Sequence, residues 1–249
     1  MTGSAPLMAR GISKAYRGVP VLREVDFEVR SGEAVGLVGS NGSGKSTLLG
    51  CLTANRLPDR GSVAVCGHDP FSDPGGAARC TGFVPEHPFL YDELTVGEVL
   101  SFVVGVRGMD SEAAGAEADR LFSLFGLEDV RPRYCGELSQ GMGRKVALTL
   151  AMLHDPEVLI LDEATNGLDR PSVDQLMGEL ERRRRTGAAV LMSSHDLDVL
   201  ATHCDRGLLL EPGAVWRMLE GDEWEAWREA PSLSAGRDGP GRDSRNESN

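Results

Sequence analysis

Short apolar runs alternate with longer segments of helical periodicity along most of this chain. Continuous apolar stretches at 34–38, 158–161, 188–192 and 208–210 are typical of strands that are buried on both faces of a parallel sheet. Between them, apolar residues recur three or four positions apart, as on one face of an amphipathic helix. Strands that alternate with helices predict an α/β fold with a mostly parallel sheet covered on both faces.

The N-terminal part of the chain follows a strand pattern instead. Val25, Phe27 and Val29 alternate with charged residues, which is typical of a half-buried strand, and an earlier strand and turn precede it. The segment 62–66 predicts another short strand. Residues 68–78 are rich in Pro, Gly and Asp, so we expect a loop there.

Helical periodicity dominates the segment 86–136. Leu121 and Phe125 are spaced i, i+4, and Asp110 or Ser111 is a suitable N-cap upstream of them. A helical segment between two strand-rich parts predicts a helical insertion in the α/β core.

One segment carries a strong motif, since the run at 34–38 is followed by the nine residues GSNGSGKST and then by a helical pattern. They fit G-x-x-x-x-G-K-[ST] in the strand–loop–helix context that the phosphate loop requires. Glycines let successive N–H groups face a phosphate chain, Lys45 can reach the β- and γ-phosphates, and Ser46 can bind Mg²⁺. The candidate nucleotide ligands are Gly39, Ser40, Asn41, Gly42, Ser43, Gly44, Lys45, Ser46 and Thr47.

A second motif is the apolar run 158–161, which ends in Asp162 and Glu163. Ligands of open α/β folds bind at the carboxyl ends of strands, so both side chains are expected at the ligand edge. Asp162 suits the coordination shell of Mg²⁺, and Glu163 can orient or deprotonate a water molecule. The alternative is a pair of surface carboxylates that cap a helix.

Three weaker signals involve single residues. Ser139 and Gly141 open a helix and could form an anion site, although Ser is also a common cap. His195 follows a buried strand and has a structural or a catalytic role. Tyr16 precedes the phosphate loop and either stacks on adenine or packs in a loop.

Together these residues resemble the ATP-binding subunit of an ABC transporter over residues 7–215. The resemblance implies a P-loop NTPase core with a mostly parallel sheet, an antiparallel β subdomain and an inserted α-helical subdomain at about 86–136. The domain would span residues 1–229, followed by a disordered tail at 230–249, which is poor in apolar residues. The matching motifs are Walker A at 39–47, Walker B at 158–163, the signature at 138–142, the D-loop at 167–169, the switch His195 and the A-loop Tyr16.

The resemblance also implies roles for individual residues. ATP would bind with Mg²⁺, with Glu163, His195 and Lys45 as catalytic residues and Tyr16 on the base. Ser139, Gly141 and the D-loop Asp169 would contact the ATP held by a second copy or by a homologous subunit. The proposed metal ligands are Ser46, Asp162 and Glu86.

Two positions depart from the family pattern. Glu86 stands where Gln is usual in the Q-loop, and it retains an oxygen for Mg²⁺ but loses the amide donor. Gln140 stands where Gly is usual in the signature. The Ser-x-Gly-Met form of the signature and the segment 84–91 resemble the ABC-2 type export branch.

The expected partner is a separate integral membrane permease, docked on the helical insertion with Phe89, Leu90 and Tyr91 as candidate contacts or as core residues. The chain would then be cytoplasmic and peripheral on the inner face of the cell membrane. It shows no signal peptide and no apolar run of about 18 residues. The alternative is a soluble ABC ATPase, for example in cluster assembly.

Composition narrows these functions further. The net charge of −12 argues against non-specific nucleic-acid binding, so no nucleic-acid partner is expected. The four arginines at 182–185 are interpreted as a solvated helix end. The five cysteines include no C-x-x-C pair, which predicts neither a disulfide framework nor a zinc site.

Overall fold

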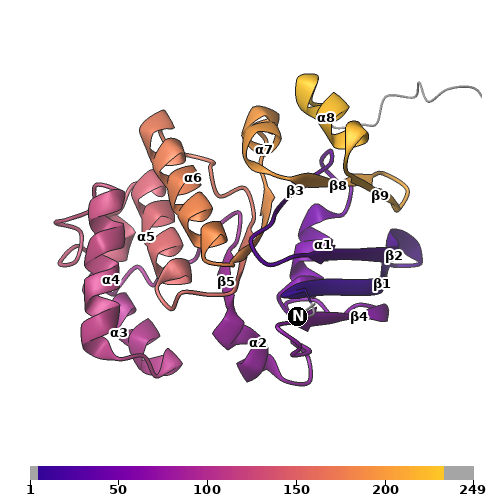
Figure 1. Cartoon of the computed structure of the whole chain (residues 1–249). Coiled ribbons are helices and arrows are strands. Elements are labelled where there is room, and N and C mark those ends of the chain that lie inside the picture. The colour runs from indigo at the N-terminus through magenta and orange to yellow at the C-terminus, as the bar shows by residue number, and fades with distance from the viewer. Residues whose placement is uncertain (1–4, 233–249) are drawn as a thin grey trace, which may run out of the picture.

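The computed structural model describes residues 5–232, which form a large sheet with helices on both faces and a smaller sheet beside it (Figure 1). The large sheet has six strands in the order β5-β6-β7-β3-β8-β9, and the small one has three in the order β2-β1-β4. The strands are β1 (Leu7–Tyr16), β2 (Val19–Val29), β3 (Ala34–Val38), β4 (Arg60–Val65), β5 (Thr81–Val84), β6 (Val158–Leu161), β7 (Ala189–Ser193), β8 (Arg206–Glu211) and β9 (Val215–Leu219).

The large sheet is parallel from β5 to β8, and β9 joins its edge antiparallel to β8. The small sheet is antiparallel throughout. The predicted α/β class, the mostly parallel sheet and the antiparallel subdomain are therefore confirmed.

Apolar residues of β6 divide the core between the two faces of the sheet. Leu159 and Leu161 pack with α5 and α6, whereas Val158 and Ile160 pack toward α1 and the small sheet. This alternation explains why β6 is apolar at every position, since a strand covered on both sides needs no polar face. The helices are α1 (Lys45–Leu52), α2 (Pro74–Cys80), α3 (Val96–Arg107), α4 (Ser111–Leu124), α5 (Gln140–Met152), α6 (Arg170–Arg185), α7 (Leu197–His203) and α8 (Asp222–Glu229).

The segment 86–136 contains two helices, α3 and α4, which lie at the end of the molecule away from the small sheet (Figure 1). Thr95 and Glu98 form a reciprocal capping box at the start of α3. Asp110 caps α4 by accepting a hydrogen bond from the Ala113 N–H, so the first of the two predicted caps is correct.

The loop predicted at 68–78 is wrong in part, because α2 begins inside it. Asp73 caps this helix through the Gly76 N–H, and Pro74 occupies the first turn, where a missing N–H does no harm. The same Asp and Pro residues that suggest a loop are thus helix-start residues here. The short elements α7, β9 and α8 also escaped sequence analysis.

The interpretation of 182–185 as a solvated helix end is wrong for Arg183, which is fully buried. Its guanidinium donates to Glu179 at 2.7 Å, to Glu117 of α4 at 2.8 Å and to Asp155 at 2.9 Å. A buried guanidinium is tolerated only when it is paired in this way. The network fastens the helical insertion to α6, and Arg120 of α4 joins it through Glu179.

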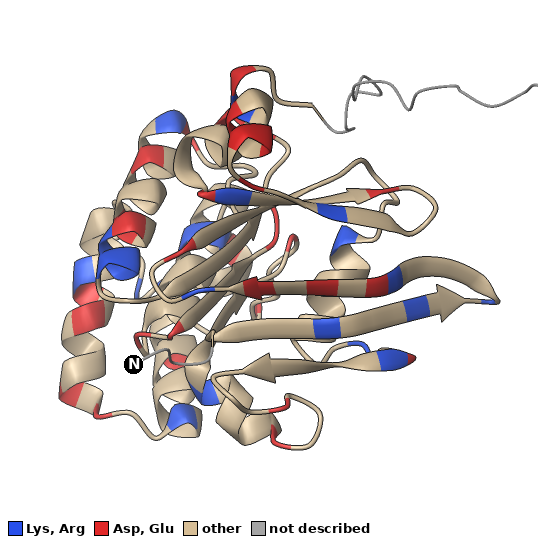
Figure 2. Cartoon of the chain, turned by 45° about the vertical axis from the view of Figure 1, so that its right-hand side comes forward, with Lys and Arg blue, Asp and Glu red and all other residues tan. Residues whose placement is uncertain are grey.

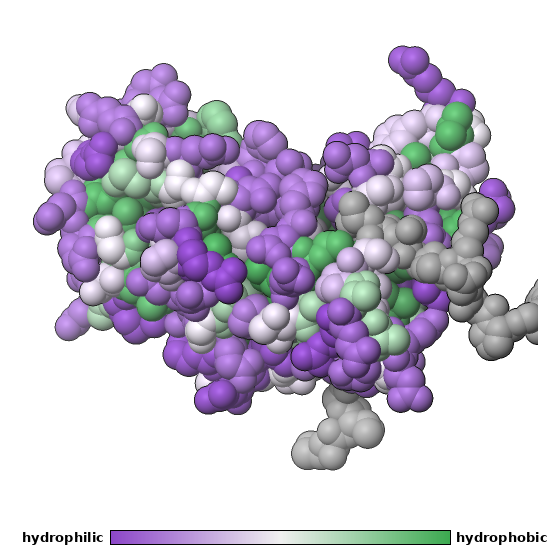
Figure 3. All heavy atoms as spheres, turned by 90° about the horizontal axis from the view of Figure 1, so that it is seen from above, coloured by the Kyte–Doolittle hydropathy of each residue, from purple (hydrophilic) through white to green (hydrophobic). Residues whose placement is uncertain are grey.

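Residues of both charge signs are spread over the chain, and several acidic residues lie on β2 (Figure 2), where they alternate with the buried Val25, Phe27 and Val29. The face drawn in Figure 3 is mostly hydrophilic, with apolar residues visible in small groups. Within residues 5–232, no helix has the length and apolar character needed to cross a bilayer. The tail predicted to be disordered falls at 233–249, apart from its first three residues, outside the described part of the chain.

Candidate active site

The phosphate-loop segment joins the carboxyl end of β3 to the start of α1, as the motif requires (Figure 1). Gly42 and Gly44 adopt left-handed conformations with φ of 79° and 108°, which side chains with a Cβ rarely adopt. A Cβ on Gly39 would lie 2.5 Å from the Leu210 carbonyl oxygen and from Ser43 Oγ. The backbone is therefore free to turn its N–H groups toward the start of α1, where the helix dipole favours an anion.

Lys45 opens α1 and folds back over the loop. Its Nζ donates to the carbonyl oxygens of Gly39 at 2.6 Å and Ser40 at 3.3 Å. An ammonium held across the mouth of the loop faces the space in front of the N–H groups. The loop thus supplies a cation and free donors for a phosphate chain.

A cavity of about 320 Å³ lies in front of this loop. Twelve of the predicted site residues line it, from five separate segments of the chain. They are Tyr16, Ser40, Asn41, Gly42, Gly44, Lys45, Ser46, Thr47, Glu86, Asp162, Glu163 and His195. Gly39 and Ser43 belong to the same loop but lie beneath its surface, Ser43 being buried.

The two carboxylates after β6 are buried side by side at the floor of the cavity. Ser193 connects them, because its hydroxyl donates to Asp162 Oδ1 at 2.7 Å and accepts from the Glu163 N–H at 2.9 Å. Glu163 has a φ of 50°, a left-handed conformation that is unfavourable for a residue with a side chain. Strain of this kind persists where the surrounding structure fixes the residue, here by hydrogen bonds to its N–H and carbonyl.

Burial raises the pKa of both carboxyls. For Asp162 the nearby Glu86 adds to this effect, while the hydrogen bond from Ser193 opposes it. For Glu163, His195 and Lys45 oppose it. A carboxylate with a raised pKa is a stronger base than an exposed one, which suits Glu163 for accepting a proton from water.

His195 and Tyr16 lie at the rim of the cavity. The His195 N–H donates to Glu163 Oε2 at 2.7 Å, and its Nε2 is 3.7 Å from Glu163 Oε1. Glu163 Oε1 itself is buried and has no hydrogen-bond partner among the described residues. The Tyr16 hydroxyl accepts from Arg56 at 2.8 Å, and Tyr16 lines the cavity.

Arg144 is a site residue that sequence analysis missed. It is buried in α5, and its guanidinium donates to the carbonyl oxygens of Glu86 and, at 2.8 Å, Glu163. One side chain thereby holds both backbone segments that carry these acids. A signal was present, since Arg144 is one helical turn before Leu148 and so falls on the buried face of its helix.

Ser139, Gly141 and Asp169 do not line the cavity. Ser139 caps α5 through the Met142 N–H at 3.3 Å, and Asp169 caps α6 through the Ser172 N–H at 3.1 Å. The signature and D-loop are adjacent, because a Cβ on Gly141 would lie 2.7 Å from the Gly167 carbonyl oxygen. These residues form a second polar surface of the same chain.

The family model for the ABC transporter matches residues 22–166. The Nod factor export ATP-binding protein I of Burkholderia orbicola (strain AU 1054) is 36% identical over 210 residues, covering 84% of this chain and 69% of the relative. The chain belongs to the ABC transporter family. Within that family it is an ATP-binding and ATP-hydrolysing subunit with the P-loop ABC ATPase fold.

Other relatives and structures agree with this family. The ABC-type transporter ATP-binding protein EcsA of Bacillus subtilis (strain 168) is 32% identical, covering 84% of this chain and 85% of the relative. The methionine import ATP-binding protein MetN of Myxococcus xanthus (strain DK1622) is 34% identical, covering 84% and 68%. A solved ATP-binding subunit of an ABC transporter has a TM-score of 0.82 at 30% identity, covering 86% of this chain and 90% of that one. A dimeric bacterial ABC transporter cassette, with a TM-score of 0.77 at 24% identity over 86% and 99%, shows the same fold.

Proposed function

We propose that this ABC ATPase drives a separate membrane permease, working in pairs with ATP held between two cassettes. The observation that carries the proposal is the cavity in which Lys45, Asp162, Glu163 and His195 converge. Each of these side chains matches one requirement of ATP hydrolysis: a cation for phosphate charge, a metal ligand, a base and a polar group beside it.

Glu163 is the proposed general base. It is buried, its pKa is raised, and its Oε1 lies 3.7 Å from His195 Nε2. A water molecule between Glu163 and the γ-phosphate could lose a proton to the Glu163 carboxylate as it attacks. His195 would hold the γ-phosphate in place while Glu163 accepts the proton and becomes neutral.

The donor set fits Mg²⁺. Asp162, Ser46 and Glu86 present only oxygen atoms, which are the ligands that this cation prefers, and all three line the cavity. Bound there with ATP, Mg²⁺ would neutralise phosphate charge. Ser193 keeps Asp162 oriented for this task by its 2.7 Å hydrogen bond.

Pairing explains the residues that lie outside the cavity. Ser139 and Gly141 begin a helix whose N-terminus favours an anion, and Asp169 lies in the adjacent turn. Packing this surface against the phosphate loop of another cassette would place Ser139 on the γ-phosphate. The proposed partner is a second copy of the chain or a homologous subunit.

A second, more apolar cavity supports docking of a permease. It measures about 600 Å³ and lies between α2, β5 and α5, beside the segment that follows Glu86. Phe89 is 78% exposed and Leu90 lines the same groove, whereas Tyr91 lies outside the lining. An exposed aromatic at the rim of an apolar groove is suited to receive a short helix of a membrane subunit, which would place the chain on the inner face of the membrane.

The direction of transport is a separate proposal. Matched relatives are named for export and for import. The form of the signature and the segment 84–91 favour export. Cargo accumulation in inside-out vesicles, with permease and chain together, would support export, and ATP-driven depletion of preloaded cargo would support import.

Substitution Glu163→Gln tests the proposed cycle. Gln keeps the shape and can hold water but does not accept a proton at neutral pH, so hydrolysis should fall by about 10²–10⁴-fold. ATP binding should survive, and the variant should elute as a dimer with Mg²⁺-ATP during size-exclusion chromatography. The double variant Glu163→Gln with Ser139→Arg should return to monomer, because the added cation blocks the contact between cassettes.

Two results would contradict the proposal. Wild-type hydrolysis by Glu163→Gln would remove this residue from the base role. A dimer that persists with Ser139→Arg would remove the signature from the interface. Co-purification with a multi-span protein from membranes distinguishes transport from a soluble role.

A further inference from the structure

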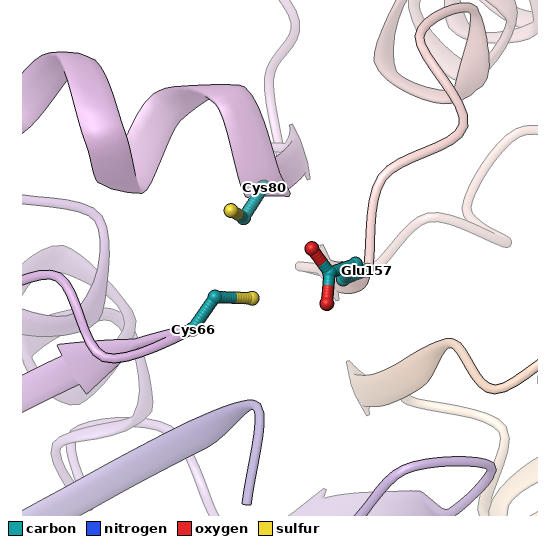
Figure 4. A group of neighbouring side chains, drawn as sticks. All are labelled: Cys66, Cys80 and Glu157. Atoms are coloured by element: carbon teal, nitrogen blue, oxygen red, sulfur yellow. The ribbon is translucent and has the colours of Figure 1, made fainter.

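Two cysteines and a glutamate meet at the end of the large sheet opposite the ATP cavity. Cys66 follows β4, Cys80 ends α2 and Glu157 immediately precedes β6 (Figure 4). Both Sγ atoms and a carboxylate oxygen lie within 4.8 Å of one another. In an ideal tetrahedral zinc site, two thiolates are about 3.8 Å apart, given Zn–S bonds of about 2.3 Å. The three groups therefore need to move inward by only about 1 Å to share one cation.

The backbone of each residue is fixed in place. The Cys66 N–H donates to the Pro6 carbonyl oxygen at 2.7 Å, and the Glu157 carbonyl accepts from the Ala189 N–H at 2.8 Å. Cys80 is held by the last turn of α2. Three groups that come from separate, ordered elements form a preorganised set rather than a chance meeting of flexible side chains.

The turn that presents Cys66 is unusual for its residue type. Val65 and His68 exchange two hydrogen bonds of 2.8 Å, and Cys66 and Gly67 between them have φ of 49° and 82°. Two positive φ values are typical of a type I′ turn, in which Asn or Gly is favoured at the first position. A thiol occupies this strained position and is directed at Glu157.

The charge of the cluster also favours a cation. Within residues 5–232, the Glu157 carboxylate forms no ion pair, so no basic side chain balances its negative charge beside the two thiols. A divalent cation would do so, with thiolates formed as protons leave.

We propose that Cys66, Cys80 and Glu157 form a binding site for Zn²⁺ or a similar thiophilic divalent cation, with a fourth position open to solvent. Two sulfur ligands favour Zn²⁺ over Mg²⁺ or Ca²⁺, which prefer oxygen. Cys66 and Cys80 are half-buried and Glu157 is exposed, so an ion can enter and keep a water ligand. The bound ion would fasten the small sheet and α2 to the start of β6, independently of ATP.

Cobalt substitution tests the site, since Co²⁺ bound to thiolates gives a charge-transfer absorption. Full-length protein, kept reduced with a phosphine and free of nucleotide, is titrated with Co²⁺ and then with Zn²⁺. We expect one Co²⁺ per chain with thiolate absorption, displacement by one Zn²⁺, proton release, and a higher melting temperature with Zn²⁺. The absence of thiolate absorption would overturn the proposal, as would loss of two hydrogens by mass in protein purified without the phosphine, if peptide mapping places a disulfide between Cys66 and Cys80.

Variants assign the ligands. Cys66→Asn, which suits the turn, and Cys80→Ser should each weaken binding by at least about tenfold and reduce the thiolate absorption. Glu157→Gln should retain the absorption but bind about tenfold more weakly. Cys135→Ser is the matched control, because this buried thiol lies outside the cluster, and it should bind as wild type. An unchanged affinity in Cys66→Asn and Cys80→Ser, or an equal loss in the control, would overturn the assignment.

Discussion

The two ends of β6 carry acidic groups in opposite settings. After the strand, Asp162 and Glu163 are buried at the ATP cavity and held by hydrogen bonds with Ser193 and, for the Glu163 carbonyl oxygen, from Arg144. Before it, Glu157 is exposed beside the thiols of Cys66 and Cys80. One strand thus links an ATPase site that provides its own cation, Lys45, to a cluster that provides none.

The difference follows from the polarity of the sheet. The carboxyl ends of parallel strands face helix N-termini and their positive dipole ends, so buried carboxylates and phosphates are tolerated there. The amino ends face helix C-termini, where a carboxylate has no such support. An acidic cluster at that end is balanced only by a side chain or by an added cation, which is the basis of the zinc proposal.

Substitution Lys45→Ala should produce the largest difference between the effect on ATP hydrolysis and the effect on Co²⁺ binding. It removes the ammonium that spans the loop, so ATP hydrolysis should fall by about 10²–10³-fold, the size expected for losing one preorganised charge. Co²⁺ binding at the cysteine cluster should not change. Steady-state phosphate release measures ATP turnover, and the cobalt titration measures binding at the cysteine cluster in the same preparation. Wild-type turnover would contradict the site assignment, and a parallel loss of Co²⁺ binding would show that the ends are coupled.

The residues of the ATP site could be predicted from the sequence because most of them are adjacent to one another in the chain. The phosphate loop occupies nine successive residues, and Asp162 and Glu163 directly follow an apolar strand, so spacing carries the information. The cysteine cluster could not be predicted from spacing. Cys66, Cys80 and Glu157 are separated by 13 and 76 intervening residues, and only the pairing of β4 and β5 within their sheets brings them together.

Burial of charge was equally hard to predict. Arg183 lies in a helix among other charged residues, where such a side chain is usually solvated, and Arg144 falls on the buried face of its helix with no partner nearby in the sequence. Their partners Glu117, Asp155 and the Glu86 carbonyl come from distant segments. The helix at α2 was missed for a different reason, since Asp and Pro serve both loops and helix starts.

Substitution Arg144→Met should have an intermediate effect confined to the ATP end. Met fills the space but leaves the carbonyl oxygens of Glu86 and Glu163 without a buried donor, which should lower the free energy of unfolding by about 2–3 kcal/mol. Turnover should fall by about tenfold to 100-fold, because Glu163 is no longer held in its strained conformation. Thermal unfolding and ATPase assays measure both effects. Arg184→Met is the control and should retain turnover, because it removes an ion pair with Asp205 and hydrogen bonds to the Gly32 and His203 carbonyl oxygens, none of which lines the ATP cavity. Full turnover in the Arg144 variant would show that Glu163 is positioned without this support.

The smallest change should come from Glu86→Gln, which alters charge while keeping an oxygen at the same reach. Glu86 lines the cavity and adds to the raised pKa of Asp162, so its neutral replacement should let Asp162 ionise more readily. A metal ligand needs the ionised form, and the loss of one negative charge near Mg²⁺ works in the opposite direction. These effects partly cancel, so basal hydrolysis should stay within about tenfold of wild type.

Because Glu86 also begins the segment that leads to the Phe89 groove, stimulation by the permease should change more than basal turnover. ATPase rates with and without reconstituted permease separate the two. A collapse of basal hydrolysis would mean that the Glu86 carboxylate takes part in the chemistry itself, and that the acid at this position is required rather than merely tolerated.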